Sequence, residues 1–123
     1  MLKNFEEITK ELNDYEKNVL YPIVIAGLTR HVGKENAISG KEICNALNQK
    51  MNGPKLVGPR LRKIIQAIRI TGDLGLICSA QKGYFVAKTA KEIDDCIHSL
   101  QQRVNQQQRI IDALTWQREQ QVK

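Results

Sequence analysis

Apolar residues recur every three or four positions along most of the chain, which is the spacing of amphipathic helices. Near the N-terminus this spacing predicts a short helix with one apolar face (Phe5, Ile8 and Leu12). A second helix is predicted from Tyr15 to about His31. Pro22 lies inside it, so that helix either begins at Pro22 or is kinked there.

The next stretch, "AISGKEICNAL", predicts a very short strand at Ile38 followed by a helix. Ser39 stands three residues before Glu42, which is the spacing of a capping box at a helix N-terminus. Ile43, Ala46 and Leu47 continue at helical spacing, and "NGP" then ends the helix.

The stretch "GPRLRKIIQAIR", from Gly58 to Arg69, predicts a helix with Pro59 in its first turn and Gly72 beyond its end. Its predicted buried stripe is apolar: Leu61, Ile64, Ile65 and Ile68. Its predicted exposed side is mostly cationic and consists of Arg60, Arg62, Lys63, Gln66 and Ala67, with Arg69 at the far end. This basic face is either an ordinary solvated surface or a surface for an anionic partner.

After "GDLG" the apolar period shortens to two, so "LICS" and "YFVA" predict a β-hairpin with Gly83 at its turn. Thr89 and Glu92 repeat the capping-box spacing and predict the start of a long final helix. Its apolar positions follow a heptad pattern with one polar residue in the seam: Ile93, Ile97, Leu100, Val104, Gln107, Ile111 and Leu114. The pattern predicts a coiled coil, because the helix is longer than the remaining chain can cover, and leaves parallel and antiparallel pairing open.

Charge and cysteine content narrow the class of protein. The formal net charge is +6, and the segment 43–72 holds six cations and no acidic residue. Such a concentration favours an anionic partner over a merely solvated surface. The three cysteines are widely spaced and form no Cys-x-x-Cys pair, which is typical of a reduced cytoplasmic protein without a zinc site or disulfide scaffold.

Helix, short strand, helix, helix, hairpin is the element order of a winged helix-turn-helix domain, and three motifs strengthen this resemblance. "ISGKEICNAL" resembles the first helix of the helix-turn-helix, "GPRLRKIIQAIRITGDLGLICS" is similar to the recognition helix of bacterial and phage (prophage) regulators, and "QKGYFVA" resembles the wing. The expected fold is mainly α with a small β-hairpin wing. The expected division is a winged helix-turn-helix domain over 1–88 and a C-terminal coiled-coil helix over 89–123.

The resemblance implies a DNA-binding protein acting in transcription regulation or phage-type replication, with double-stranded DNA as its partner. The residues expected at the DNA are Lys55, Arg60, Arg62, Lys63, Gln66, Arg69 and Lys82. A homodimer is expected through Ile93, Ile97, Leu100, Val104, Gln107, Ile111 and Leu114. The alternative is a winged-helix protein-interaction module within a larger assembly. Neither reading requires a cofactor, a metal, a membrane or a small-molecule ligand.

An enzyme is not expected, because no motif supplies a catalytic site. "GLTRHVGKE" has the wrong glycine spacing for a phosphate-binding loop, and Glu35 stands where a magnesium-binding Ser or Thr belongs. Cys96 and His98 have no second pair of metal ligands. His31 is interpreted as a C-terminal capping residue rather than a catalytic base.

Overall fold

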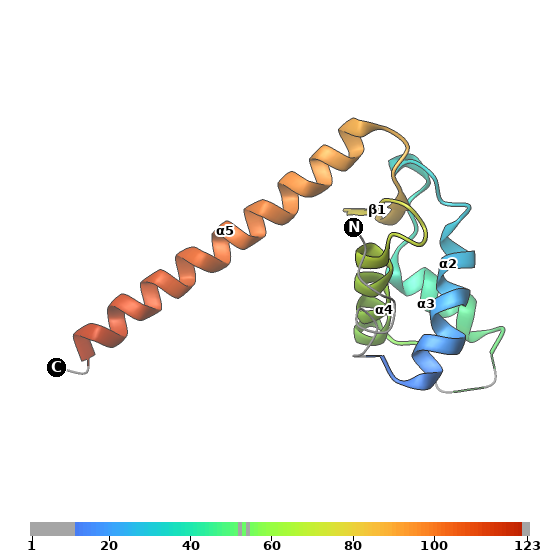
Figure 1. Ribbon diagram of the computed structural model, residues 1–123, viewed down its shortest axis with the longest axis horizontal. Helices are drawn as coiled ribbons and strands as arrows, with labels where there is room; N and C mark the ends of the chain where they lie inside the picture. The colour runs from blue at the N-terminus through green and yellow to red at the C-terminus, as the bar shows by residue number, and fades with distance from the viewer. Residues whose placement is uncertain (1–11, 52, 54, 122–123) are drawn as a thin grey trace.

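A small helical body and one long projecting helix make up the protein (Figure 1). The computed structural model describes residues 12–51, 53 and 55–121. Within these residues the protein is mainly helical, with one two-stranded antiparallel sheet. None of the described helices combines the length and the apolar character that crossing a membrane requires. The helix predicted through Phe5 and Ile8 lies outside the described residues.

The second predicted helix is present, and it changes character at Pro22. A π-type turn, η1 (Glu16–Leu20), leads directly into α2 (Tyr21–Leu28), with Pro22 in the first turn of α2. The wider turn accommodates a proline ring that would collide with the carbonyl four residues earlier. Helix α2 ends at Leu28, three residues before the predicted end near His31. The His31 N–H donates to the Leu28 carbonyl at 2.9 Å, and Nδ1 of its side chain lies 2.9 Å from the carbonyl oxygen of Asn36.

Two consecutive helices follow, α3 (Gly40–Asn48) and α4 (Gly58–Thr71), after a short 3-10 turn, η2 (Lys34–Asn36). The capping box of Ser39 and Glu42 at the start of α3 is confirmed. The connection from α3 to α4 is long, and one side chain fixes its end. The Asn48 amide donates to the Leu56 carbonyl at 2.9 Å and accepts from the Leu56 N–H at 2.8 Å.

Helix α4 carries the centre of the hydrophobic core. Its predicted apolar stripe, Leu61, Ile64, Ile65 and Ile68, is almost completely buried. The expectation that Ala67 faces outward was wrong: it is 5% exposed and packs in the core with the stripe. The helix ends as predicted, with Gly72 in the left-handed conformation at φ 76°.

The hairpin consists of β1 (Ile77–Ala80) and β2 (Gly83–Val86), so the two-residue turn is tighter than "AQKG" predicted. The predicted strand at Ile38 is present as an isolated antiparallel bridge to Tyr84, with N–H to carbonyl distances of 2.9 and 2.8 Å. Gly83 has a φ of 132°, and a Cβ there would collide with the Ile38 carbonyl oxygen. Glycine at this position therefore permits the chain before α3 to pair with β2.

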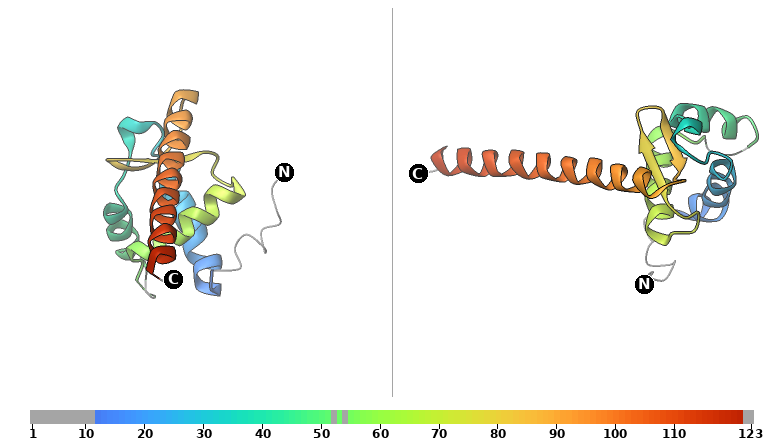
Figure 2. Two further views of the ribbon diagram at one scale, coloured as in Figure 1. Left: turned by 90° about the vertical axis from the view of Figure 1, so that its left-hand side faces the viewer. Right: turned by 90° about the horizontal axis from the view of Figure 1, so that it is seen from above.

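The final helix, α5 (Ala90–Gln121), leaves the body beside the hairpin and extends away from it (Figure 2). The Thr89 hydroxyl accepts from the Glu92 N–H at 3.2 Å, as the predicted cap requires. Glu92 also accepts from the backbone N–H groups of Lys34 and Lys88, at 2.9 and 2.7 Å. No residue of α5 is buried, so the helix is anchored only at its first turns.

Candidate nucleic-acid interface

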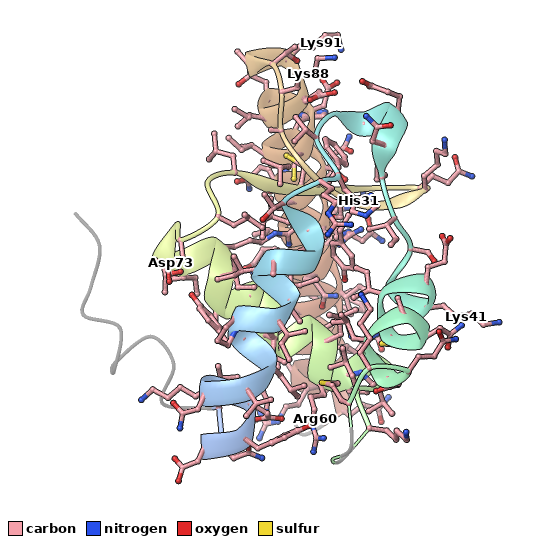
Figure 3. The ribbon with its side chains drawn as sticks, turned by 90° about the vertical axis from the view of Figure 1, so that its right-hand side faces the viewer. His31, Lys41, Arg60, Asp73, Lys88 and Lys91 are labelled. Atoms are coloured by element: carbon pink, nitrogen blue, oxygen red, sulfur yellow. The ribbon has the colours of Figure 1, made fainter. Side chains whose placement is uncertain are left out.

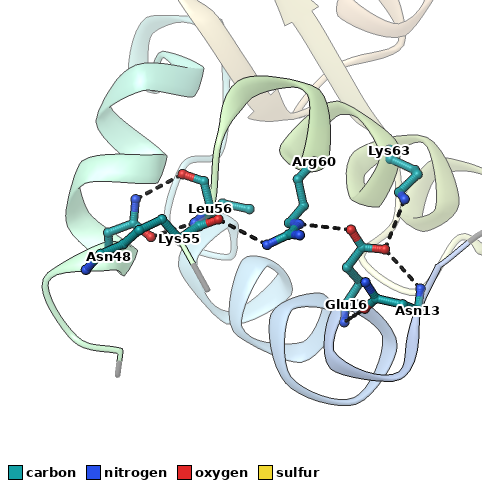
Figure 4. Close-up of polar contacts among 7 residues, drawn as sticks. All are labelled: Asn13, Glu16, Asn48, Lys55, Leu56, Arg60 and Lys63. Atoms are coloured by element: carbon teal, nitrogen blue, oxygen red, sulfur yellow. Dashed lines mark hydrogen bonds and ion pairs between the residues drawn. The ribbon is translucent and has the colours of Figure 1, made fainter. Parts of the chain in front are cut away.

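Two cations of the predicted DNA-binding face are paired inside the molecule. The Arg60 Nε atom lies 3.0 Å from Oε2 of Glu16, and the Lys63 Nζ atom lies 3.0 Å from Oε1 of the same carboxylate (Figure 4). The Glu16 side chain is only 3% exposed, whereas those of Arg60 and Lys63 are 27% and 42% exposed. These two cations therefore join α4 to the segment before α2, and one acidic charge offsets them.

The local sequence before α2 holds Glu16 in place. The Asn13 N–H donates to Oε1 of Glu16 at 2.9 Å, and the Asn13 amide oxygen accepts from the Glu16 N–H at 2.8 Å, which is a reciprocal helix cap. Burial alone would raise the pKa of Glu16. The bond from Asn13 and the nearby Lys63 and Arg60 outweigh it, and the pKa lies below its ordinary value.

Sequence reasoning missed Glu16 as part of this region. The signal was present locally, because Asn13 precedes Glu16 by three residues, which is the capping-box spacing. That spacing predicts a helix start, but it does not indicate that Glu16 contacts Arg60, which lies 44 positions further along the sequence. Local charge counting therefore gave α4 a surface more basic than the one it presents.

Arg69 also has a structural role. Its Nε donates to the Ile77 carbonyl at 3.1 Å, and its Nη2 lies 3.2 Å from the Ser79 hydroxyl. Both partners belong to β1, so Arg69 holds the hairpin against the end of α4. A guanidinium used in this way offers little to an outside partner.

The remaining four predicted residues are exposed. Arg62 and Gln66 face outward from α4, Lys55 lies in the connection before it, and Lys82 lies at the hairpin turn. Among the described residues, none of these four side chains has a hydrogen-bond or ion-pair partner. The Lys55 backbone carbonyl accepts from Nη1 of Arg60 at 3.1 Å, which ties the connection to the start of α4.

Arg62 borders an open hollow of about 370 Å³ between the starts of α3 and α4. Lys41 and Asn45 line the hollow from α3, and Tyr84 lines it from β2. The Lys41 side chain extends away from the body (Figure 3). Sequence reasoning did not select Lys41, although its place beside the Ser39 cap predicts an exposed first turn of α3.

The predicted dimerisation residues form an uncovered stripe along α5. Exposure is 58% at Ile97, 40% at Leu100, 59% at Val104, 53% at Ile111 and 59% at Leu114. Gln107 is exposed between them, and Ile93 is half-buried near the body. Apolar side chains this exposed over many helical turns favour a binding partner.

Searches against protein-family models, curated proteins and solved structures find no significant match to this chain.

Proposed function

We propose that the protein binds duplex DNA as a homodimer through a winged helix-turn-helix, with α3 and α4 as the helix pair and the β1–β2 hairpin as the wing. The observation that carries the proposal is that each of these three elements carries an exposed cation, Lys41 on α3, Arg62 on α4 and Lys82 at the hairpin turn, for which no ion pair is found among the described residues. In such a domain the second helix of the pair reads the major groove, while its neighbours contact the backbone.

Within this proposal, the exposure and the contacts of each residue suggest its role. Arg62 and Gln66 are the base-contacting candidates on α4, since arginine can bind guanine and glutamine can bind adenine with two hydrogen bonds each. Lys41, Lys55 and Lys82 are the phosphate-contacting candidates. Arg60, Lys63 and Arg69 support the shape of the surface, because each one contacts another segment of the body.

The number of exposed cations predicts how strongly DNA binding depends on salt. Four exposed cations, Lys41, Lys55, Arg62 and Lys82, would neutralise about four phosphates. At about 0.9 per phosphate, the logarithm of the binding constant would fall with the logarithm of salt at a slope of roughly −4. Had Arg60 and Lys63 also been available, the slope would be closer to roughly −5.

The test is a duplex-binding titration at two salt concentrations with the full chain and two matched charge reversals. Arg62→Glu changes the proposed interface, and Arg109→Glu makes the same change on the exposed part of α5, away from the body. We expect Arg62→Glu to weaken binding at least tenfold and Arg109→Glu to leave it within about twofold. Equal binding by all three proteins, independent of salt, would contradict the proposal.

The homodimer has a separate test in sedimentation. A chain ending at Gln102 keeps the turns of α5 that lie beside the body and removes Val104, Gln107, Ile111 and Leu114. We expect the full chain to sediment as a dimer and the shortened chain as a monomer. Identical association by both chains would place the dimer contact elsewhere. A monomeric full chain that fails to bind DNA would favour a module that docks into a larger assembly.

A further inference from the structure

The exposed stripe of α5 begins beside an apolar groove of the body. Leu76, which precedes β1, is 54% exposed and faces this groove of about 200 Å³, whose other wall includes Ile93, Ile97 and Leu100 of α5. The first apolar positions of the heptad pattern therefore continue onto the surface of the body. A second helix packed along the stripe would also cover the open side of this groove.

The residue types in the stripe favour one kind of coiled coil. Counting from Ile93 as position d, the a positions hold Ile97, Val104 and Ile111, and the d positions include Leu100 and Leu114. In parallel coiled coils, β-branched residues at a with leucine at d favour two strands. Larger assemblies are favoured by isoleucine at d or leucine at a. Two d positions depart from leucine: Ile93, at the body end, and the polar Gln107.

The polar residue in the stripe also distinguishes the two directions of pairing. In a parallel, in-register pair the two-fold axis brings Gln107 of each copy into the same layer, where the amides can donate to and accept from each other. In an antiparallel pair a d-position residue such as Gln107 would face an a position of the partner, which here is Ile97, Val104 or Ile111, and none of these side chains can satisfy a buried amide. The parallel pairing alone gives Gln107 a polar partner.

We propose that the occupant of this stripe is a second copy of the chain, with the two α5 helices parallel and in register. Both bodies then lie at the same end of the coiled coil, and each Leu76 lies beside the partner helix. This inference rests on the homodimer of the proposed function and specifies its geometry. Two α4 helices would be held close enough to address adjacent turns of one duplex.

Site-specific crosslinking tests the direction of pairing in the full chain. Ile97→Cys and Leu114→Cys are introduced separately in a Cys96→Ser background, since Cys96 is half-exposed and Cys44 and Cys78 are buried. Gln106→Cys, on the opposite side of α5, is the matched control. Each protein is treated with a short bis-maleimide, alone and in a mixture of differently tagged Ile97→Cys and Leu114→Cys chains.

The parallel arrangement predicts that Ile97→Cys and Leu114→Cys each form covalent dimers alone, several-fold more than Gln106→Cys. It also predicts no 97-to-114 product in the mixture, since these residues are separated by about 25 Å along a helix at about 1.5 Å per residue. A dominant 97-to-114 product without self-crosslinking would overturn the inference in favour of antiparallel pairing. Equal yields for all three positions would overturn the pairing itself.

These outcomes are independent of the DNA-binding test. Crosslinking is measured without DNA, so a chain that shows the parallel pattern but no salt-dependent duplex binding would remove the proposed DNA function and keep the geometry of the dimer. An antiparallel crosslinking pattern with intact salt-dependent duplex binding would remove the proposed dimer geometry and keep the proposed DNA function.

Discussion

Arg60 of α4 and Glu16 of the segment before α2 form a 3.0 Å ion pair across 44 positions of sequence. Lys63 reaches the same carboxylate one turn later on α4. Two of the cations of α4 therefore hold the body together. The outward-facing positive charge comes from Arg62 on α4, Lys41 on α3 and Lys82 at the hairpin turn.

Replacing Glu16 with glutamine should destabilise the body. The amide keeps the shape of the side chain but removes the charge that Arg60 and Lys63 contact. Its NH₂ group also replaces a carboxylate oxygen that accepts hydrogen bonds, so two donors face each other. We expect the free energy of unfolding to fall by about 1–3 kcal/mol. Urea unfolding followed by circular dichroism measures it, and an unchanged midpoint and slope would contradict the structural role of the pair.

The contribution of Glu16 should depend on pH in a defined direction. Its folded pKa lies below the ordinary value of 4.5, so the charged form stabilises the folded state above about pH 4.5. This stabilisation is lost as the pH falls from 4.5 through the folded pKa. The stabilities of the wild type and Glu16→Gln should therefore differ at neutral pH and converge in acid, and a constant difference across that range would oppose this assignment.

Neighbouring cations on α4 should respond differently to charge reversal. Lys63→Glu places a second carboxylate against the buried Glu16, and we expect it to lower the free energy of unfolding by at least about 1 kcal/mol. Arg62→Glu changes an exposed side chain without a partner among the described residues, so we expect a change within about 0.5 kcal/mol. Thermal unfolding of the two variants side by side measures both changes. Equal losses of stability would mean that Arg62 also has a structural role.

Gly83→Ala should be more damaging than Gly75→Ala, although both glycines have positive φ. A Cβ at Gly83 would collide with the Ile38 backbone, while nothing lies within 4 Å of a Cβ at Gly75. We expect a loss of about 1–2 kcal/mol for Gly75→Ala from backbone strain alone. For Gly83→Ala we expect about 3 kcal/mol or more, measured by urea unfolding. Similar losses would show that the Ile38–Tyr84 bridge yields easily.

Short-range signals predicted most of the elements. The Ser39 and Glu42 cap, the isoleucine stripe of α4, the stop at Gly72 and the start of α5 are each encoded within a few neighbouring residues, so one sequence suffices to locate them. The end of α2 was placed three residues too late, because no local signal marks Leu28 as the last helical residue and the first glycine stop is Gly33.

The composition of the candidate interface was harder to predict, because it depends on contacts between distant segments. Nothing local indicates that Glu16 pairs with α4 or that Arg69 binds the backbone of β1. Ala67 was assigned outward by helical spacing alone, but the core of this body extends around more of α4 than the isoleucine stripe covers.

Glu92 connects three segments where α5 leaves the body: the 3-10 turn at Lys34, the connection after β2 at Lys88 and the helix itself. The helix beyond it, which ends at Gln121, is a lever of about 44 Å at about 1.5 Å per residue. A change of about 10° in its exit angle would carry its far end through roughly 8 Å. In the proposed dimer, the contacts of Glu92 would therefore help to fix the direction in which each body faces relative to the coiled coil.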